Sequence, residues 1–105
     1  MYATEKFPCP CCGYLVFDHL PGFHQDCPIC GWQDDLSQLR FPLMPGSSNT
    51  VSLLEAQQNF LRYGASERRN VGKTRDPMDD EEVEQGWRVL TPAHDNIELP
   101  SRGNS

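Results

Sequence analysis

The chain has 105 residues, of which 37% are hydrophobic, and its formal net charge is −6. This length suits one domain, and the apolar content leaves a lean core of the kind that a metal ion or disulfides often supplement. No apolar run approaches the ~18 residues of a membrane span, and residues 1–6 lack the features of a signal peptide. With an odd number of cysteines, we expect a cytoplasmic protein without membrane contact.

All five cysteines lie between Phe7 and Trp32, in two copies of a C-P-x-C-G motif, CPCCG at 9–13 and CPICG at 27–31. Two cysteines separated by two residues can bind one metal ion if the backbone turns tightly, which the proline and glycine favour. Fourteen residues separate the pairs, close to the spacing of four-cysteine zinc sites. We predict one bound ion, with Zn²⁺ favoured over iron, which rubredoxin-like knuckles also bind. The predicted ligands are Cys9, Cys12, Cys27 and Cys30.

Cys11 is left over by this assignment. We interpret it as filling the third position of the first motif, as Ile29 does in the second. The alternatives are that it replaces a neighbouring ligand or acts as a reactive thiol, although nearby thiolates disfavour its ionisation. His24 lies three residues before Cys27, but four cysteines already complete a tetrahedral site, so we interpret it as a supporting or surface histidine.

The segment between the motifs predicts a strand and a turn. Residues 13–18 are rich in aromatic and β-branched side chains, and residues 21–22 are a Pro-Gly turn signal. Residues 23–24 then lead into the second motif, so we expect a short hairpin-like pairing with the strand. We expect Trp32 to cover one face of the metal site.

An acidic pair and a loop follow the second motif. We interpret Asp34 and Asp35 as a solvated turn and helix start; the alternative is a partner-contact or acid–base pair. Residues 40–49 are rich in Pro, Gly and Ser and predict a linker loop.

The clearest helix spans residues 52–64. Ser52 and Glu55 form a capping box, and Gly64 supplies a left-handed C-terminal cap. An apolar face with helical spacing is predicted to pack on the knuckle strands, with an interaction helix as the alternative. Its residues are Leu53, Ala56, Phe60 and Tyr63. Asn59, beside this face, is expected to hydrogen-bond the preceding loop.

Residues 65–90 have segregated charges. ERRNVGKTR at 67–75 has four basic residues and one acidic, whereas DDEEVE at 79–84 has five acidic residues. Such runs are usually solvated faces, although these two can screen each other or the basic one can face a partner. We predict a short helix over 76–85, beginning at an Asp-Pro pair. The side chains expected to return to the core are Val83, Trp87, Val89 and Leu90.

These elements predict one α+β domain over residues 1–95. It combines a small zinc-ribbon or rubredoxin-like knuckle module (7–32) and its short β-hairpin with one amphipathic helix (52–64), followed by the irregular charged segment (65–90). Metal binding and folding are expected to be one equilibrium. Residues 96–105 have little apolar content and predict a disordered tail.

Three motifs in this order resemble the cysteine-rich CPCC domain proteins: FPCPCCGY at 7–14, CPICGWQDD at 27–35 and NTVSLLEAQQNFLRYGA at 49–65. The resemblance covers about residues 7 to 77. The chain departs from the family at Gln33, where Glu is common, at Tyr63, where Phe is common, and at Gly31. The resemblance implies a zinc-binding cytoplasmic domain, brings no well-defined activity, and offers no catalytic residues to carry over.

Our leading functional hypothesis is a structural-zinc protein whose acidic surface contacts another protein, such as a basic toxin or nuclease that it would neutralise as an immunity or antitoxin partner. A closed four-cysteine site leaves no coordination position for water or substrate. No Ser-His-Asp set, phosphate loop or paired-carboxylate motif rises above chance, so we do not expect an ordinary hydrolase or transferase.

Two alternatives stay open. One is a redox or metal-handling protein that uses Cys11 or a rubredoxin-like iron. The weaker one is a nucleic-acid module that binds phosphates through the basic run. Its residues are Arg68, Arg69, Lys73 and Arg75. The first 50 residues hold two basic residues against five acidic ones, which argues against phosphate binding by the metal module.

Overall fold

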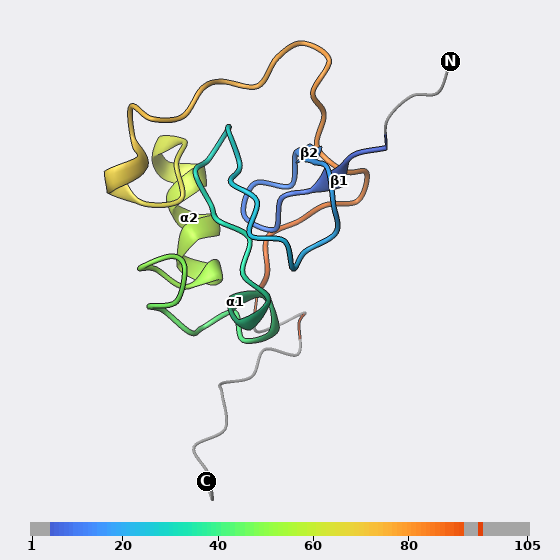
Figure 1. Ribbon diagram of the computed structural model, residues 1–105. Helices are drawn as coiled ribbons and strands as arrows, with labels where there is room; N and C mark the ends of the chain where they lie inside the picture. Colours follow the sequence, from blue (N-terminus) through green and yellow to red (C-terminus); the bar gives the residue numbers. More distant parts are fainter. Residues whose placement is uncertain (1–4, 92–94, 96–105) are drawn as a thin grey trace, which may run out of the picture.

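The computed structural model describes residues 5–91 and Asp95 of the chain (Figure 1). Its regular elements are β1 (Phe7–Pro8), β2 (Leu15–Phe17), α1 (Leu36–Arg40), α2 (Leu53–Tyr63) and the 3-10 helix η1 (Arg68–Asn70). The strands pair antiparallel, and the chain beyond η1 crosses the molecule and returns beside them (Figure 1). This is the small α+β fold that the sequence predicts. None of the described helices is long and apolar enough to cross a membrane.

The β-hairpin is built around the first cysteine motif. Its register pairs Phe7 with Phe17 and Pro8 with Leu15. The predicted pairing of residues 13–18 with residues 23–24 is therefore wrong. The motif itself reverses the chain, because the Cys9 amide donates to the Tyr14 carbonyl at 3.0 Å. The segments on its two sides consequently already run antiparallel.

Backbone amides of the loop between the motifs donate hydrogen bonds to side-chain oxygens. The buried Asp34 carboxylate accepts from the amides of Gly22 and Phe23 at 2.6 and 3.2 Å. The Gln25 side chain accepts from two further amides of the loop. Because these amides are already bonded, they are not available for a strand ladder, which is why the loop does not pair with β2.

Asp35 begins helix α1. One oxygen of its carboxylate accepts from two amides of the first turn at 2.8 and 3.2 Å, which is an N-cap. The other accepts from the Ser47 hydroxyl and the Ser48 amide. Burial raises the pKa of Asp35, but these hydrogen bonds, led by that of Ser47, outweigh it and lower the pKa. The predicted helix start is confirmed, whereas the predicted solvation is wrong, because Asp34 and Asp35 are only 0% and 5% exposed.

Two buried amide side chains organise the segment 40–49. The Gln38 side-chain nitrogen donates to three carbonyls beyond α1, at 3.0, 3.3 and 2.9 Å. Asn49 donates to the Gln38 side chain at 2.9 Å and to the Gln33 carbonyl at 2.8 Å. The predicted loop is confirmed, since residues 41–49 hold no helix or strand. The loop is not a loose linker, because its buried hydrogen bonds tie α1 to the end of the second cysteine motif.

Helix α2 has the predicted caps. The Ser52 hydroxyl accepts from the Glu55 amide at 3.1 Å, and Gly64 ends the helix with a φ of 79°. These caps bond backbone groups that a helix leaves without partners. Asn59 donates to the carbonyl of Ser66 at 2.9 Å, so its expected contact with the preceding loop is wrong, because it bonds the loop that follows the helix.

One face of α2 packs on the core, as its helical spacing predicts. Leu53 and Ala56 are buried there. The same face carries Gln57, which is also buried. Its amide nitrogen donates to the Pro10 carbonyl at 2.9 Å, and its oxygen accepts from the Leu90 amide at 2.8 Å. Gln57 therefore joins α2 to the first cysteine motif and to the C-terminal segment.

In the part of the chain that the structure describes, no helix follows η1, so the predicted helix over 76–85 is wrong. This segment pairs instead with the first cysteine motif. The Glu84 amide donates to the Gly13 carbonyl at 2.9 Å, and Val83 forms a β-bridge with Tyr14. Extended pairing over this distance in sequence outweighs a weak local helix signal.

The predicted return of the C-terminal segment to the core is confirmed in part. Leu90 packs against the core, and the Trp87 ring lies against Gly13. Val83 remains 41% exposed. Residues 96–105, the predicted disordered tail, lie outside the described residues.

The two charged runs meet at an ion pair. The Arg75 guanidinium donates to both carboxylate oxygens of Glu81 at 2.7 and 2.8 Å. The hydrogen bonds from Arg75 lower the pKa of Glu81 to about 2. At this point the runs screen each other, which is one of the two arrangements that the sequence left open.

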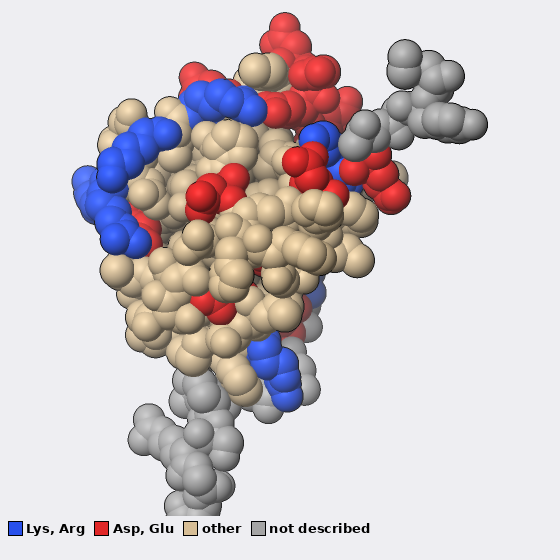
Figure 2. Space-filling view, in the orientation of Figure 1, with Lys and Arg blue, Asp and Glu red and all other residues tan. Residues whose placement is uncertain are grey.

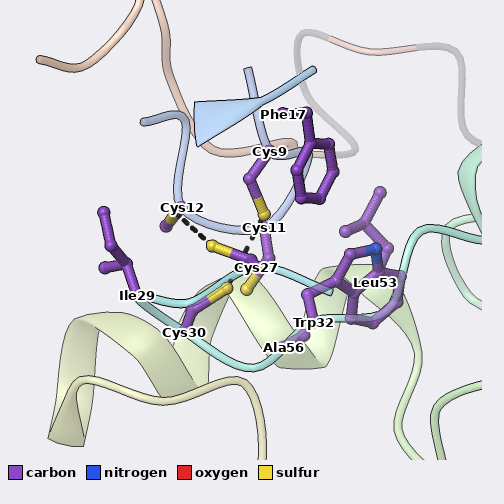
Figure 3. Packing of buried hydrophobic residues seen from close by; sticks show 10 residues of the cluster. All are labelled: Cys9, Cys11, Cys12, Phe17, Cys27, Ile29, Cys30, Trp32, Leu53 and Ala56. Carbon is purple, nitrogen blue, oxygen red and sulfur yellow. Dashed lines mark hydrogen bonds between the residues drawn. The ribbon is translucent and has the colours of Figure 1, made fainter. Parts of the chain in front are cut away.

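The hydrophobic core contains all five cysteines (Figure 3). The other buried members of this cluster are Phe17, Ile29, Trp32, Leu53 and Ala56. The core therefore has few aliphatic side chains and is rich in sulfur, in agreement with the low apolar content of the sequence.

Replacing Gln57 with Ala is expected to destabilise the protein by about 2 kcal/mol or more, because a buried carbonyl and a half-buried amide each lose a partner. Urea unfolding measures the loss, and hydrogen exchange at the Leu90 amide should speed up. Gln58→Ala is the matched control, since Gln58 is the exposed neighbour and its loss should stay within about 0.5 kcal/mol. Equal losses in both variants would contradict the assigned role of Gln57.

Candidate metal centre

The two C-P-x-C-G motifs fold into two copies of one turn. In each, the glycine amide donates to the carbonyl of the first cysteine. The amide of that cysteine donates to the carbonyl of the residue that follows the glycine. The distances are 2.7 and 3.0 Å in the first copy and 2.9 and 2.9 Å in the second. Gly13 and Gly31 have φ values of 80° and 86°, in the left-handed region that glycine adopts readily.

The two turns bring four sulfur atoms together. The Sγ atoms that lie within 4.8 Å of one another are those of Cys9, Cys12, Cys27 and Cys30, the four predicted ligands. Cys9 Sγ is 3.6 Å from Cys30 Sγ, and Cys12 Sγ is 3.7 Å from Cys27 Sγ (Figure 3). Each of these contacts joins one motif to the other. The four side chains are at most 4% exposed.

The spacing of the sulfur atoms fits a tetrahedral ion. Zn–S bonds of about 2.3 Å place the corners of a tetrahedron about 3.8 Å apart. The two measured separations, 3.6 and 3.7 Å, are close to this value. The donor set is also the soft one that zinc and iron accept. The protein thus has a four-cysteine cluster that is positioned to hold a metal ion.

Electrostatics in the cluster favour a cation. Burial raises the pKa of the Cys9 and Cys30 thiols. Hydrogen bonds from neighbouring thiols, that of Cys12 first, lower the pKa of Cys27. Burial therefore opposes deprotonation of Cys9 and Cys30. A divalent ion at the centre supplies the charge that keeps all four ligands deprotonated.

Neighbouring residues are placed differently from the four cysteines. Cys11 lies outside the set, is 2% exposed, and has its pKa raised by burial. His24 is exposed on the loop between the motifs and is not part of the cluster, which agrees with its interpretation as a surface histidine. Trp32 is buried in the same core cluster as the cysteines (Figure 3).

A segment after α2 covers the second turn. The Ser66 amide donates to the Cys30 carbonyl at 2.7 Å, and the Arg75 amide donates to the Pro28 carbonyl at 3.1 Å. The Asn70 side chain donates to the Gly31 carbonyl at 3.2 Å. These residues were missed by sequence reasoning, because a serine and an asparagine in a polar run carry no sign of burial against a metal site.

The last described segment covers the first turn. The Glu82 carbonyl accepts from the Leu15 amide, and the Glu84 amide donates to the Gly13 carbonyl. The Trp87 ring packs so closely that a Cβ on Gly13 would lie 2.5 Å from its atoms. Here a signal existed, since a tryptophan in an acidic, polar run predicts burial. Each cysteine turn thus has its own covering segment from the second half of the chain.

Substituting Gly31 with Ala is expected to destabilise the protein more than Gly72→Ala. Both glycines have similar φ values, 86° and 89°, but a Cβ on Gly31 would lie 2.7 Å from the Asn70 side chain, whereas a Cβ on Gly72 meets nothing within 4 Å. Gly72→Ala should cost about 1–2 kcal/mol for the left-handed backbone alone, and Gly31→Ala about 1–3 kcal/mol more for the clash. Urea unfolding at a fixed concentration of free metal ion compares them, and equal costs would contradict close packing of η1 on the turn.

The comparison with known protein families agrees with this geometry. The family model described as Cysteine-rich CPCC matches residues 7–81, a range that includes both cysteine motifs, helix α2 and the Arg75–Glu81 ion pair. A search of curated proteins finds none that matches the chain. Because the family match spans well over half of the 105 residues, the chain belongs to the cysteine-rich CPCC family.

Proposed function

We propose that this protein is an interaction module in which a structural Zn²⁺ ion holds the fold and an acidic segment contacts a basic protein partner. The observation that carries the proposal is the attachment of the acidic segment to the metal site. Its backbone pairs with the first cysteine turn through the Glu84–Gly13 hydrogen bond and the Val83–Tyr14 bridge. A bound ion would therefore also hold the acidic side chains in place.

Zinc is the ion that we propose for the cluster. The four cysteines would each supply a thiolate, and a site filled by four protein ligands serves structure because no position is open to water or substrate. A core whose sulfur atoms need a cation makes folding depend on that ion. Iron in the same site would give a coloured protein, so a colourless preparation with one zinc per chain separates the two ions.

The proposed contact surface is the acidic segment, defined as residues 79–84. Asp79, Asp80 and Glu82 are exposed, whereas Glu81 is neutralised by Arg75. Figure 2 shows acidic side chains gathered along the upper edge of the molecule, where the chain crosses it in Figure 1. Complementary charge speeds association and selects partners, which is why we propose a basic partner such as a toxin or nuclease.

The state of the cysteines supports the cytoplasm as the proposed compartment. All five are free thiols in the structure, and a reducing compartment keeps thiols in that state. Burial of Cys11 and its raised pKa argue against its use as a redox thiol, because the thiolate is the reactive form.

Serine substitutions test the metal site. Cys9→Ser, Cys12→Ser, Cys27→Ser and Cys30→Ser should each release the metal and unfold the domain, because structural zinc contributes on the order of 10 kcal/mol to small folds. Cys11→Ser is the matched control and should keep one metal per chain. Elemental analysis and circular dichroism give the two readouts. Loss of metal in Cys11→Ser with retention in Cys9→Ser would show that the ligand assignment is wrong.

Purification from the native host, followed by binding with both purified proteins, tests the partner. We expect a basic protein in stoichiometric amount, with affinity that falls as salt rises. Asp79→Asn/Asp80→Asn should weaken binding by about ten-fold. Glu5→Gln/Asp26→Asn makes the same change in net charge at exposed positions outside the segment and should have little effect. A protein that emerges alone and binds nothing would refute the proposed role.

A further inference from the structure

A polar hollow lies on the side of α2 that faces η1. It has a volume of about 450 Å³ and is bordered by the loop before α2, the exposed side of α2, and η1. Its charged lining residues are Arg62, Arg68, Arg69, Glu55 and Glu67. Figure 2 shows basic side chains gathered along the edge of the molecule that carries α2 and η1 in Figure 1, apart from the acidic cluster. The hollow is therefore distinct from the acidic segment.

The arginines of the hollow are held in two different ways. Arg69 is paired, because its Nε lies 2.9 Å from Glu67 Oε1. The Glu67 carboxylate is buried and also accepts from the Thr50 amide at 3.1 Å. Glu67 is thus already fully engaged by the protein and leaves no charge to neutralise the other two arginines.

Arg68 is positioned without an acidic partner. Its guanidinium carbon lies 4.6 Å from the centre of the Tyr63 ring, a cation–π arrangement that holds the planar group flat. Within residues 5–91 and Asp95, no carboxylate pairs with Arg68 or with Arg62. Because no carboxylate of the described residues pairs with Arg68, its N–H groups are available, and their planar arrangement matches the two oxygens of a carboxylate or phosphate.

The charge balance of the hollow selects between these anions. Three arginines and two glutamates line it, so the formal charge of the lining is +1. A single carboxylate brings this to zero, whereas a phosphate dianion or a strand of phosphates leaves an excess of negative charge on a chain whose net charge is already −6. Glu55 lies seven residues before Arg62, about 10 Å along the helix, and so leaves the Arg62 end of the hollow open.

We infer that this hollow is a binding site for the carboxylate of an Asp or Glu side chain in a peptide segment of a partner protein. Arg68 supplies the planar pair of N–H donors, and Arg62 supplies a second positive charge. The ion pair between the exposed Arg69 and the buried Glu67 fixes the wall between them. The Tyr63 ring orients Arg68 and is a positioning residue. The site is independent of the acidic segment and of any partner that the segment binds.

Peptide titration of the zinc-loaded full chain tests the site, with the arginine Nε–Hε resonances followed by NMR. The probe is an acetylated and amidated Gly/Ser peptide with one central glutamate, and its glutamine counterpart is the control. We expect saturable shifts of the Arg62 and Arg68 resonances with the glutamate peptide only. No saturation at millimolar peptide, or equal shifts with the glutamine peptide, would overturn the inference.

Substitutions of the two arginines give a second test of the site. Arg68→Gln and, separately, Arg62→Gln should weaken binding by about five-fold. Lys73→Gln makes the same charge change in the same basic run outside the hollow and should leave binding within about two-fold. Equal weakening in all three variants would reduce the effect to net charge and overturn the site. Zinc content and the amide spectrum confirm that each variant is folded.

Peptides that carry other anions give a third test, which separates an acidic side chain from a phosphate or a chain terminus. The same peptide with phosphoserine in place of glutamate should bind no more tightly than the glutamate peptide. A glutamine peptide with a free C-terminal carboxylate should bind more weakly than the glutamate peptide. Tighter binding of either peptide would overturn the assignment to an acidic side chain.

Discussion

The fold is organised around one electrostatic constraint, the gathering of four buried sulfur atoms within 4.8 Å of one another. Burial raises the pKa of Cys9 and Cys30, and the surrounding core offers few aliphatic side chains that would fold the chain without them. The cysteines are at once the centre of the core and the group that is positioned to hold a metal ion.

The rest of the chain is arranged around the two cysteine turns. Helix α2 closes one side through Leu53 and Ala56, and Gln57 extends that contact to the first turn and to Leu90. The covering segments bond the turns mainly through backbone groups, so their side chains are free to carry charge. This explains how a chain with segregated basic and acidic runs can place both on the surface without disturbing the metal centre.

The cluster, the caps of α2 and its apolar face could be predicted from the sequence because each depends on residues a few positions apart. The buried polar residues could not, since Gln38, Asn49 and Gln57 look like surface residues until distant carbonyls are placed beside them. Asp34 and Asp35 look solvated for the same reason. The predicted helix over 76–85 failed because its backbone pairs with the first cysteine turn, about 70 residues earlier. Local patterns predicted the four-cysteine cluster, and long-range hydrogen bonds decided what surrounds it.

The order of the segments along the chain has a consequence for synthesis on the ribosome. All four cysteines have been synthesised once the chain reaches residue 30, whereas the segments that cover their turns begin at residue 66 and residue 82. A nascent chain therefore presents its thiols as a local cluster, with a small loop-closure cost, well before the shielding segments emerge. An ion bound during that interval would be open to exchange with the solution, and arrival of the C-terminal half would enclose it.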